Sequence, residues 1–443
     1  MNGTWTLHVD NFAKIKKADV KLNSLMCFVG DNNSGKSYLM SLLWGILTIG
    51  KDFFPKKPSK SKTYIECERW LESVQNQDVL IDDAVSSLYI TWFNEILNSN
   101  KKALMKKLFN FEVAIEKLEI RDYFREKPIS IKWNENRERY STQKNSIFFP
   151  KREVISRDEL LKMNSYICWF MVMGELSAPL LTQAVMGRRN GEPVYLPASR
   201  TGFMLTYPQL VESSLQKSFS TEQEDSVSLL TLPYVDFLQL ITRFEVSVKK
   251  NKYIEIIDFM ENRMTNGDLS VKKQMLPVIK YHPKGSDKEL PLHVASSIIS
   301  ETAPLLLLLK SNIKFNTLII EEPEAHLHPE LQQQMARVII RIVNSGIPVW
   351  LTTHSDTMIQ HINNMIKLKG NTKTKQNQLM NEFSYEPEDL ISRDNISMYQ
   401  FVKEDNRSRL EALKCNKYGF VVNTFNDSLK KILDEVYAFQ DED

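Results

Sequence analysis

The residues best suited to chemistry form one short loop, Gly30-Asp-Asn-Asn-Ser-Gly-Lys-Ser37. The loop matches the phosphate-binding pattern G-x-x-x-x-G-K-[ST] at every fixed position, between an apolar run at 25–29 and a helical pattern at 38–44. Glycines let the backbone turn so that successive N–H groups point at phosphate oxygens, and the helix adds its unpaired first amides. In such a loop Lys36 reaches the β- and γ-phosphates, and the Ser37 hydroxyl ligates Mg²⁺. The sequence therefore predicts a site for ATP and Mg²⁺ formed by Gly30, Asn32, Asn33, Ser34, Gly35, Lys36 and Ser37.

A pair of carboxylates follows a later apolar strand, Thr317-Leu-Ile-Ile-Glu-Glu322. In ATP hydrolysis one carboxylate at such a strand end holds the metal, and the other lies beside the attacking water. We assign Glu321 to the magnesium shell and Glu322 to the general base. Most ATPases of this kind carry Asp at the first position, and because Glu321 is one methylene longer we expect slow turnover. Solvated acids at a surface strand are the alternative.

Three histidines lie near these acids in the sequence. His354 follows the next apolar strand, in Leu351-Thr-Thr-His-Ser-Asp356. Because ligands bind at the carboxyl ends of parallel strands, we expect His354 near the γ-phosphate, where it could donate a hydrogen bond. A structural histidine is the alternative. His326 and His328 could bind zinc with neighbouring acids, but we favour a place where two ATPase subunits touch.

The bulk composition is that of an ordinary globular protein. A chain of 443 residues is too long for one simple core, so we expect one large domain with insertions or two domains. The formal net charge of +2 neither demands nor excludes a nucleic-acid partner. No apolar run approaches the roughly 20 residues that span a bilayer, and the first residues lack a secretion signal. With four scattered cysteines and no CxxC pair, we expect a cytoplasmic protein without a membrane partner.

The hydrophobic pattern divides the chain into four parts. Residues 1–50 and 191–366 are expected to form an ATPase core, 51–190 an insertion within it, and 367–443 a tail. The core alternates strands with helices, and its signals include strands at 317–321 and 347–351 and helices at 295–310, 329–343 and 355–366. The predicted fold class is therefore α/β, with a P-loop ATPase head interrupted by the insertion and followed by a short α/β tail.

The insertion is predicted to be mainly helical. Its apolar residues recur at helical spacing from about 64 to 108, and a further helix is expected from 158 to 185. Residues 129–133 and 146–149 are expected to form a hairpin. In the tail, the basic and polar stretch 367–378 is expected to be a mobile loop. Because ATP chemistry does not explain the insertion, we take it as the surface for sensing or assembly.

The motifs together resemble the ABC-type ATPase heads of the overcoming-lysogenization-defect, RecF and SMC group. The stretches that carry the resemblance are Asn32-Asn-Ser-Gly-Lys-Ser37, Ile320-Glu-Glu-Pro-Glu-Ala-His-Leu-His-Pro329 and Thr352-Thr-His-Ser-Asp356. It covers 1–50 and about 190–366 well, and the insertion poorly. It implies that two copies sandwich ATP, and that a serine-containing signature from one head contacts the γ-phosphate held by the other.

The resemblance also points to two less regular stretches. Val294-Ala-Ser-Ser-Ile-Ile-Ser-Glu301 matches the signature, but Ile298 replaces the usual glycine. Ser296 and Ser297 could still present hydroxyls at a helix N-terminus, and ordinary helix capping is the alternative. The stretch Leu196-Pro-Ala-Ser-Arg-Thr-Gly202 recurs in smaller defence-associated members. There Arg200 could reach phosphate or the partner subunit, or form a structural salt bridge.

The tail is too short for the Toprim nuclease domain that overcoming-lysogenization-defect proteins carry. Within the group the chain is similar to the AriA ATPases of PARIS anti-phage systems, whose Toprim nuclease partner is a separate chain. This similarity implies a homo-oligomeric scaffold that holds the effector and releases it when a phage protein is sensed. A Septu-type ATPase paired with an HNH nuclease is the nearest alternative. A repair or chromosome-type head that clamps DNA remains possible, although the sequence shows neither a long coiled coil nor a basic groove.

Overall fold

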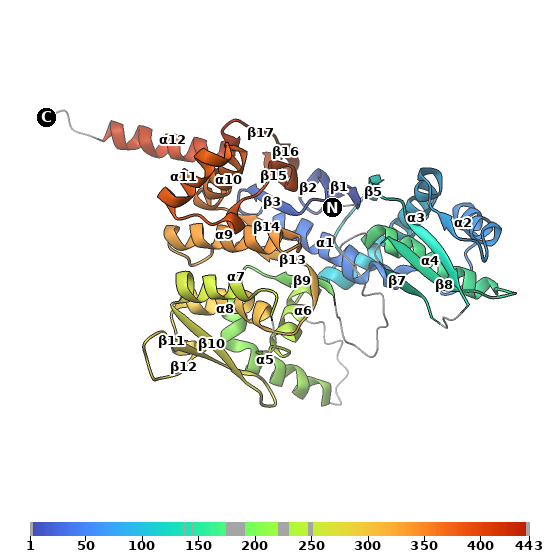
Figure 1. Ribbon diagram of the computed structural model, residues 1–443, viewed down its shortest axis with the longest axis horizontal. Helices are drawn as coiled ribbons and strands as arrows, with labels where there is room; N and C mark the ends of the chain where they lie inside the picture. The colour runs from blue at the N-terminus through green and yellow to red at the C-terminus, as the bar shows by residue number, and fades with distance from the viewer. Residues whose placement is uncertain are drawn as a thin grey trace.

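The centre of the molecule is a sheet of nine strands (Figure 1). The computed structural model describes residues 3–135, 139–143, 145–173, 191–219, 230–246 and 251–439. In these residues the strand order of the large sheet is β5-β1-β2-β16-β15-β3-β14-β13-β9. In chain order the strands are β1 (Gly3–Phe12), β2 (Ile15–Lys21), β3 (Leu25–Gly30), β5 (Lys117–Arg125), β9 (Glu192–Leu196), β13 (Phe315–Glu321), β14 (Val349–Thr353), β15 (Ile396–Glu404) and β16 (Arg407–Leu413).

Parallel pairing in one half of the sheet brings the predicted site together. Strand β3 pairs in parallel with β14 and β15, and β13 pairs in parallel with β14 and β9. All six residues of β3 are buried, as expected for a strand covered on both faces. The carboxyl ends of β3, β13 and β14 therefore lie along one edge, so the loops that follow them share one site.

The helices of the core cover both faces of this sheet. In chain order they are α1 (Lys36–Ile49), α5 (Arg200–Phe219), α6 (Leu232–Ile241), α7 (Ile254–Met260), α8 (Ser297–Lys310), α9 (Pro329–Asn344) and α10 (Asp356–Gly370). Two further helices follow, α11 (Lys373–Phe383), which buries none of its residues, and α12 (Asn423–Ala438), whose residues 430–438 are exposed. A small sheet of β10 (Gly267–Lys272), β11 (Val278–Pro283) and β12 (Leu290–Pro291) lies beyond α8. Successive residues of β3 enter two different hydrophobic cores, since Met26 and Phe28 pack on one face and Cys27 and Val29 on the other.

The insertion forms the lobe at the right of Figure 1. It contains α2 (Lys62–Ser73), α3 (Asp83–Phe109) and α4 (Arg157–Met173), with a sheet of β4 (Val79–Leu80), β6 (Ser130–Asn134), β8 (Ser146–Pro150) and β7 (Ser141–Gln143). The expected hairpin of 129–133 with 146–149 is wrong, because β6 and β8 pair in parallel. The chain reverses twice, once before β7 and once between β7 and β8, so β8 returns in the direction of β6. The helix expected at 158–185 is found up to Met173, and its remainder lies outside the described residues.

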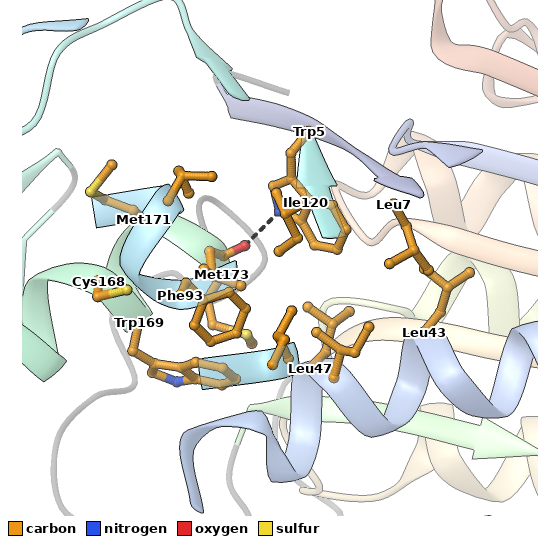
Figure 2. Close-up of a cluster of buried hydrophobic side chains, with 14 of the residues drawn as sticks. Trp5, Leu7, Leu43, Leu47, Phe93, Ile120, Cys168, Trp169, Met171 and Met173 are labelled. Carbon is orange, nitrogen blue, oxygen red and sulfur yellow. Dashed lines mark hydrogen bonds between the residues drawn. The ribbon is translucent and has the colours of Figure 1, made fainter. Parts of the chain in front are cut away.

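One hydrophobic core joins the insertion to the N-terminal strands (Figure 2). Trp5 of β1 donates a hydrogen bond from its indole nitrogen to the carbonyl oxygen of Val172 in α4, at 2.8 Å. Leu43 and Leu47 of α1 face this cluster, and Phe93 of α3 packs within it. The insertion also supplies β5, which pairs with β1 in the large sheet. The described residues of the insertion, up to Met173, are thus part of the same packed body as the N-terminal strands and α1.

The C-terminal part is integral to the large sheet. Strands β15 and β16 form an antiparallel pair, which places β15 beside β3. The mobile loop expected at 367–378 is wrong, because α10 extends to Gly370 and α11 begins at Lys373. Helix α11 buries none of its residues, so its sequence lacks the apolar periodicity by which an amphipathic helix is predicted. It is rich in straight-chain residues with good helix propensity, which gives the physical reason for its formation.

Candidate active site

The phosphate loop connects the end of β3 to the first turn of α1 and needs both of its glycines. Gly30 has φ 146° and Gly35 has φ 105°, values that other residues rarely adopt. A Cβ atom on Gly30 would lie 2.8 Å from Cβ of Phe401, and one on Gly35 would lie 2.7 Å from Cγ1 of Ile15. The loop therefore owes its shape to backbone freedom and to close packing against β15 and β2.

The Lys36 side chain lies against the loop. Its Nζ atom donates to the carbonyl oxygens of Gly30 at 2.9 Å and Asp31 at 2.7 Å, and only 6% of the residue is exposed. Burial lowers its pKa to about 8, although nearby carboxylates, Glu322 foremost, act to raise it. A bound phosphate would favour the charged ammonium, so this lysine is ready to bind an anion.

Glu321 is the buried carboxylate at the end of β13. Its Oε2 accepts from the Ala198 amide at 3.3 Å, whereas Oε1 is buried without a hydrogen-bond partner among the described residues. Burial raises its pKa, and the Ser37 hydroxyl and the Ala198 amide act to lower it. An unpartnered carboxylate oxygen next to a serine hydroxyl suits a hard cation such as Mg²⁺. Ser37 and Glu321, the residues predicted for the metal, therefore fit that role.

Glu322 stands at the mouth of the site in a left-handed backbone conformation, with φ 44°. Its amide donates to the Thr352 carbonyl at 2.9 Å, and its Oε1 lies 3.5 Å from Nε2 of His354. The hydrogen bond from His354 is the main cause that lowers the pKa of Glu322, and Lys36 contributes to the same shift. An ionised carboxylate can accept a proton near neutral pH. The structure thus brings together the residues predicted as general base and γ-phosphate sensor.

Glu324 is a site residue that the sequence reasoning missed. It is 8% exposed, and its Oε1 accepts from the Thr353 hydroxyl at 2.7 Å and from the His354 amide at 2.6 Å. This carboxylate therefore fixes the loop after β14, which carries the predicted sensor. No periodic signal marked Glu324, because the strand ends at Glu321 and the chain turns after it, with Glu322 in a left-handed conformation.

The signature-like serines and Arg200 lie around α8. Ser296 precedes the helix without a side-chain capping bond, and Ser297 begins it; both are exposed. Arg200 is 1% exposed and pairs with the Glu301 carboxylate in α8. Of the roles left open for Arg200, the structure shows the buried ion pair. His326 and His328 are exposed, and no group of three or more metal-ligating side chains is found in the described ranges.

A basic pocket of about 210 Å³ adjoins the phosphate loop. Its charged lining residues are Lys14 of the β1–β2 turn, Lys403 of β15, Arg407 of β16 and the acidic Asp31 of the phosphate loop. The Ser408 hydroxyl donates to the Ser34 carbonyl and so ties β16 to the loop. Cationic side chains beside a phosphate loop suit the rest of a nucleotide. Sequence reasoning missed these residues because it treated the tail as an appendage.

Comparison with known proteins gives a family and a kind of fold. The family model AAA_15, described as an AAA ATPase domain, matches residues 6–175 and 197–359. No curated protein matches. Among the described residues, no helix has the length and hydrophobicity needed to cross a membrane.

The solved structures that are similar include heads of SMC proteins. An SMC head bound to the C-winged helix domain of ScpA has a TM-score of 0.38 and 12% identity, and the match covers 93% of this chain and 98% of that one. An SMC head with an extended coiled coil from Pyrococcus furiosus has a TM-score of 0.35 and 11% identity, with 98% and 100% covered. The SMC head domain from Thermotoga maritima has a TM-score of 0.34 and 8% identity, with 93% and 99% covered. At these scores the likeness carries no functional argument.

Proposed function

Since the chain belongs to the AAA_15 family of AAA ATPase domains, we propose that two copies of it close on ATP·Mg²⁺, hydrolyse it slowly and thereby control a separate effector. The observation that carries the proposal is the Glu322–His354 pair, 3.5 Å apart, next to the phosphate loop. A carboxylate with a lowered pKa, a histidine and a phosphate-loop lysine are the parts that phosphoryl transfer to water needs.

The residues have separate tasks in this mechanism. The loop amides and Lys36 hold the β- and γ-phosphates, while Ser37 and Glu321 would hold Mg²⁺, which neutralises phosphate charge when bound. Glu322 orients the attacking water and accepts its proton. His354 donates a hydrogen bond to the γ-phosphate, and Glu324 keeps the His354 backbone in place through its 2.6 Å hydrogen bond. Glu321 is longer than the usual Asp, which supports slow turnover.

A second copy is needed because the site of one head is open to water. The side chains of Glu322 and His354 are 38% and 30% exposed, and hydrolysis benefits when bulk water is excluded. Exposed serines at the N-terminus of α8 can cover the γ-phosphate of another head, since helix N-termini bind anions. These features support the ATP sandwich that the resemblance implies, with Ser296 and Ser297 contributed in trans.

The effector rests on the resemblance alone. The stretch Glu322-Pro-Glu-Ala-His-Leu-His-Pro329 is part of the resemblance within which the chain is similar to AriA ATPases, so we propose a Toprim-type nuclease chain as the partner and a phage-encoded protein as the trigger. The insertion, 51–190, is the proposed surface for sensing or assembly. An HNH nuclease partner and a DNA clamp are the alternatives.

The test uses tagged protein expressed from its native operon. Glu322→Gln should lower turnover about a hundredfold or more and trap the ATP-bound complex, because it removes the base and leaves ATP contacts intact. Purification of this variant with ATP·Mg²⁺ should recover a stoichiometric nuclease chain. A bare dimer that carries only DNA would favour the clamp instead. Unchanged turnover would contradict the assignment of Glu322.

A further inference from the structure

One buried arginine connects the end of β13 and Glu322 to helix α8, which carries the signature-like serines. The guanidinium of Arg200 donates from its two Nη atoms to four acceptors, which are the carbonyl oxygens of Pro197 (3.0 Å), Glu321 and Glu322 (2.9 Å) and the carboxylate of Glu301. The Thr201 hydroxyl donates to the second oxygen of that carboxylate at 2.6 Å. We call these residues the Arg200 cluster.

Glu301 transmits this connection to the signature-like serines. It lies four residues after Ser297 in α8, a distance of about 6 Å along the helix axis. The helix is buried from Ile299 to Leu309, and its internal proline, Pro304, lies beyond Glu301, so a bend at the proline would leave Ser297 and Glu301 on the same side of it. The position of the serines and the backbone of Glu322 are therefore mechanically linked through Arg200.

We propose that Arg200 and Glu301 are positioning residues that make hydrolysis by Glu322 depend on the seating of Ser296 and Ser297 against the second head. The proposal rests on the ATP sandwich proposed above. The serines of one head would contact the ATP of its partner, whereas Glu322 of the same head acts on its own ATP. Arg200 would thus couple the two ATP molecules of one dimer.

The strained backbone of Glu322 gives the coupling its effect. A left-handed conformation for a residue with a Cβ persists only where its surroundings hold it, and here Arg200 binds the carbonyl while Thr352 binds the amide. If α8 moves and draws Glu301 with it, the carbonyl of Glu322 loses its donor. The carboxylate then leaves its place beside His354.

A role in stability alone does not explain these contacts. A buried ion pair adds little net stability compared with apolar residues of the same size, because both charges lose their hydration. Arg200 is also unavailable to phosphate, since both Nη atoms bind groups of the chain and the residue is 1% exposed. What the pair does provide is a fixed distance between α8 and the end of β13.

The test compares Glu301→Gln with Glu68→Gln. Glu68 is the control, because like Glu301 it is a buried carboxylate paired with an arginine, here Arg157 at 3.1 and 2.7 Å, although Arg157 is itself exposed. It lies in α2 of the insertion, away from the nucleotide residues. The full-length variants are compared for ATPase kcat, KM, the Hill coefficient for ATP, ATP-dependent dimerisation by light scattering, and melting temperature.

The wild type should show a Hill coefficient above 1 for ATP. Glu301→Gln should lower kcat about tenfold and bring the Hill coefficient to 1, with little change in KM or dimerisation. Glu68→Gln should change neither kcat nor the Hill coefficient. Arg200→Lys should lower kcat further, because an ammonium has three donors on one atom and cannot serve the four acceptors that two Nη atoms bind. If Glu301→Gln does not fold, Thr201→Val removes only one donor and should change kcat and the Hill coefficient in the same direction.

Two results would overturn the coupling. One is a wild-type Hill coefficient of 1 in a dimer that turns over ATP. The other is an equal loss of kcat in Glu301→Gln and Glu68→Gln, which would mean a structural role only. A wild type that neither dimerises with ATP nor hydrolyses it would instead contradict the proposed function.

Discussion

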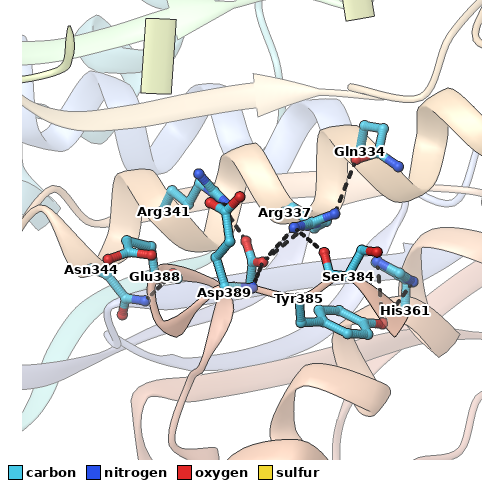
Figure 3. Close-up of polar contacts among 10 residues, drawn as sticks. Gln334, Arg337, Arg341, Asn344, His361, Ser384, Tyr385, Glu388 and Asp389 are labelled. Atoms are coloured by element: carbon cyan, nitrogen blue, oxygen red, sulfur yellow. Dashed lines mark hydrogen bonds and ion pairs between the residues drawn. The ribbon is translucent and has the colours of Figure 1, made fainter. Parts of the chain in front are cut away.

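Two buried arginine clusters in this protein use the same chemistry for different purposes. The Arg200 cluster lies at the nucleotide site, and a second one, the Asp389 cluster, joins α9 to the segment after α11 (Figure 3). In the second cluster Asp389 is fully buried and accepts from Arg337 at 2.7 and 3.0 Å and from Arg341 at 2.8 Å. Burial acts to raise the pKa of Asp389, but the hydrogen bonds from the two arginines outweigh it and lower that pKa.

The difference lies in what each guanidinium holds. Arg337 and Arg341 share a carboxylate and also contact the Phe259 ring, at 4.9 and 4.0 Å from its centre. Arg200 instead binds the carbonyls of two carboxylate residues of the site, and its Nε atom is buried without a hydrogen-bond partner among the described residues. In the Asp389 cluster both arginines are therefore paired with the buried carboxylate. In the Arg200 cluster one guanidinium nitrogen has no partner among the described residues, and the other two hold the backbone of the site in place. Four substitutions test this contrast.

Asp389→Ala should have the largest effect, and on stability alone. It leaves two buried guanidinium groups without their main acceptor, which costs about 3–5 kcal/mol of unfolding free energy. Urea unfolding measures this loss, and kcat per folded molecule should stay at the wild-type value. Because the folded-state pKa of Asp389 is lowered, its contribution is complete above the unfolded pKa and disappears as the pH falls through the folded one. A stable variant would show that the cluster is not needed for the fold.

Glu322→Gln should have the next largest effect, and on catalysis alone. A hundredfold loss of kcat corresponds to about 2.7 kcal/mol of transition-state stabilisation. Unfolding free energy should change little, because the side chain is 38% exposed. Single-turnover measurement with radiolabelled ATP separates the chemical step from product release. If Glu322→Gln lost unfolding free energy and transition-state stabilisation to the same extent, Glu322 would have a structural role.

Glu324→Ala should affect catalysis through His354. Removal of the carboxylate leaves the His354 amide and the Thr353 hydroxyl without their acceptor, and we expect kcat to fall about tenfold, or about 1.4 kcal/mol. Glu324→Gln keeps a carbonyl acceptor of the same length and should restore most of the loss. A Gln variant as slow as the Ala variant would indicate that the charge, and not the hydrogen bond, is required.

Glu321→Gln should have the smallest effect on the stability of the ligand-free protein, and with the opposite sign. Burial raises the folded-state pKa of Glu321, so its ionised form destabilises the ligand-free protein at neutral pH, and this cost is relieved as the pH falls through that pKa. The amide should therefore raise the unfolding free energy at pH 7 by about 1 kcal/mol. Thermal unfolding without metal measures it. Added ATP·Mg²⁺ should stabilise the wild type more than the variant, and a reversed order would remove Glu321 from the metal site.

Much of the site could be predicted because its signals are local. The loop from Gly30 to Ser37, the acids after β13 and the histidine after β14 each follow a continuous apolar strand, so parallel pairing was enough to bring them together. The pairing of Arg200 with Glu301 could not be predicted, since a buried ion pair between distant segments leaves no periodic pattern. The place of β15 beside β3 could not be predicted either, because it depends on the tertiary fold.

The pairing of β15 with β3 has a consequence for how the protein folds during translation. Leu25 of β3 pairs with Ile396 of β15, and Phe401 of β15 packs where a side chain on Gly30 would be. Until residues beyond 396 leave the exit tunnel, the strand that carries the phosphate loop has an open edge, and domains form late when their contacts are distant in sequence. Until then β3 pairs only with β14, and Gly30 lacks its packing against Phe401, so we expect the phosphate loop to reach its final shape only after β15 has been made.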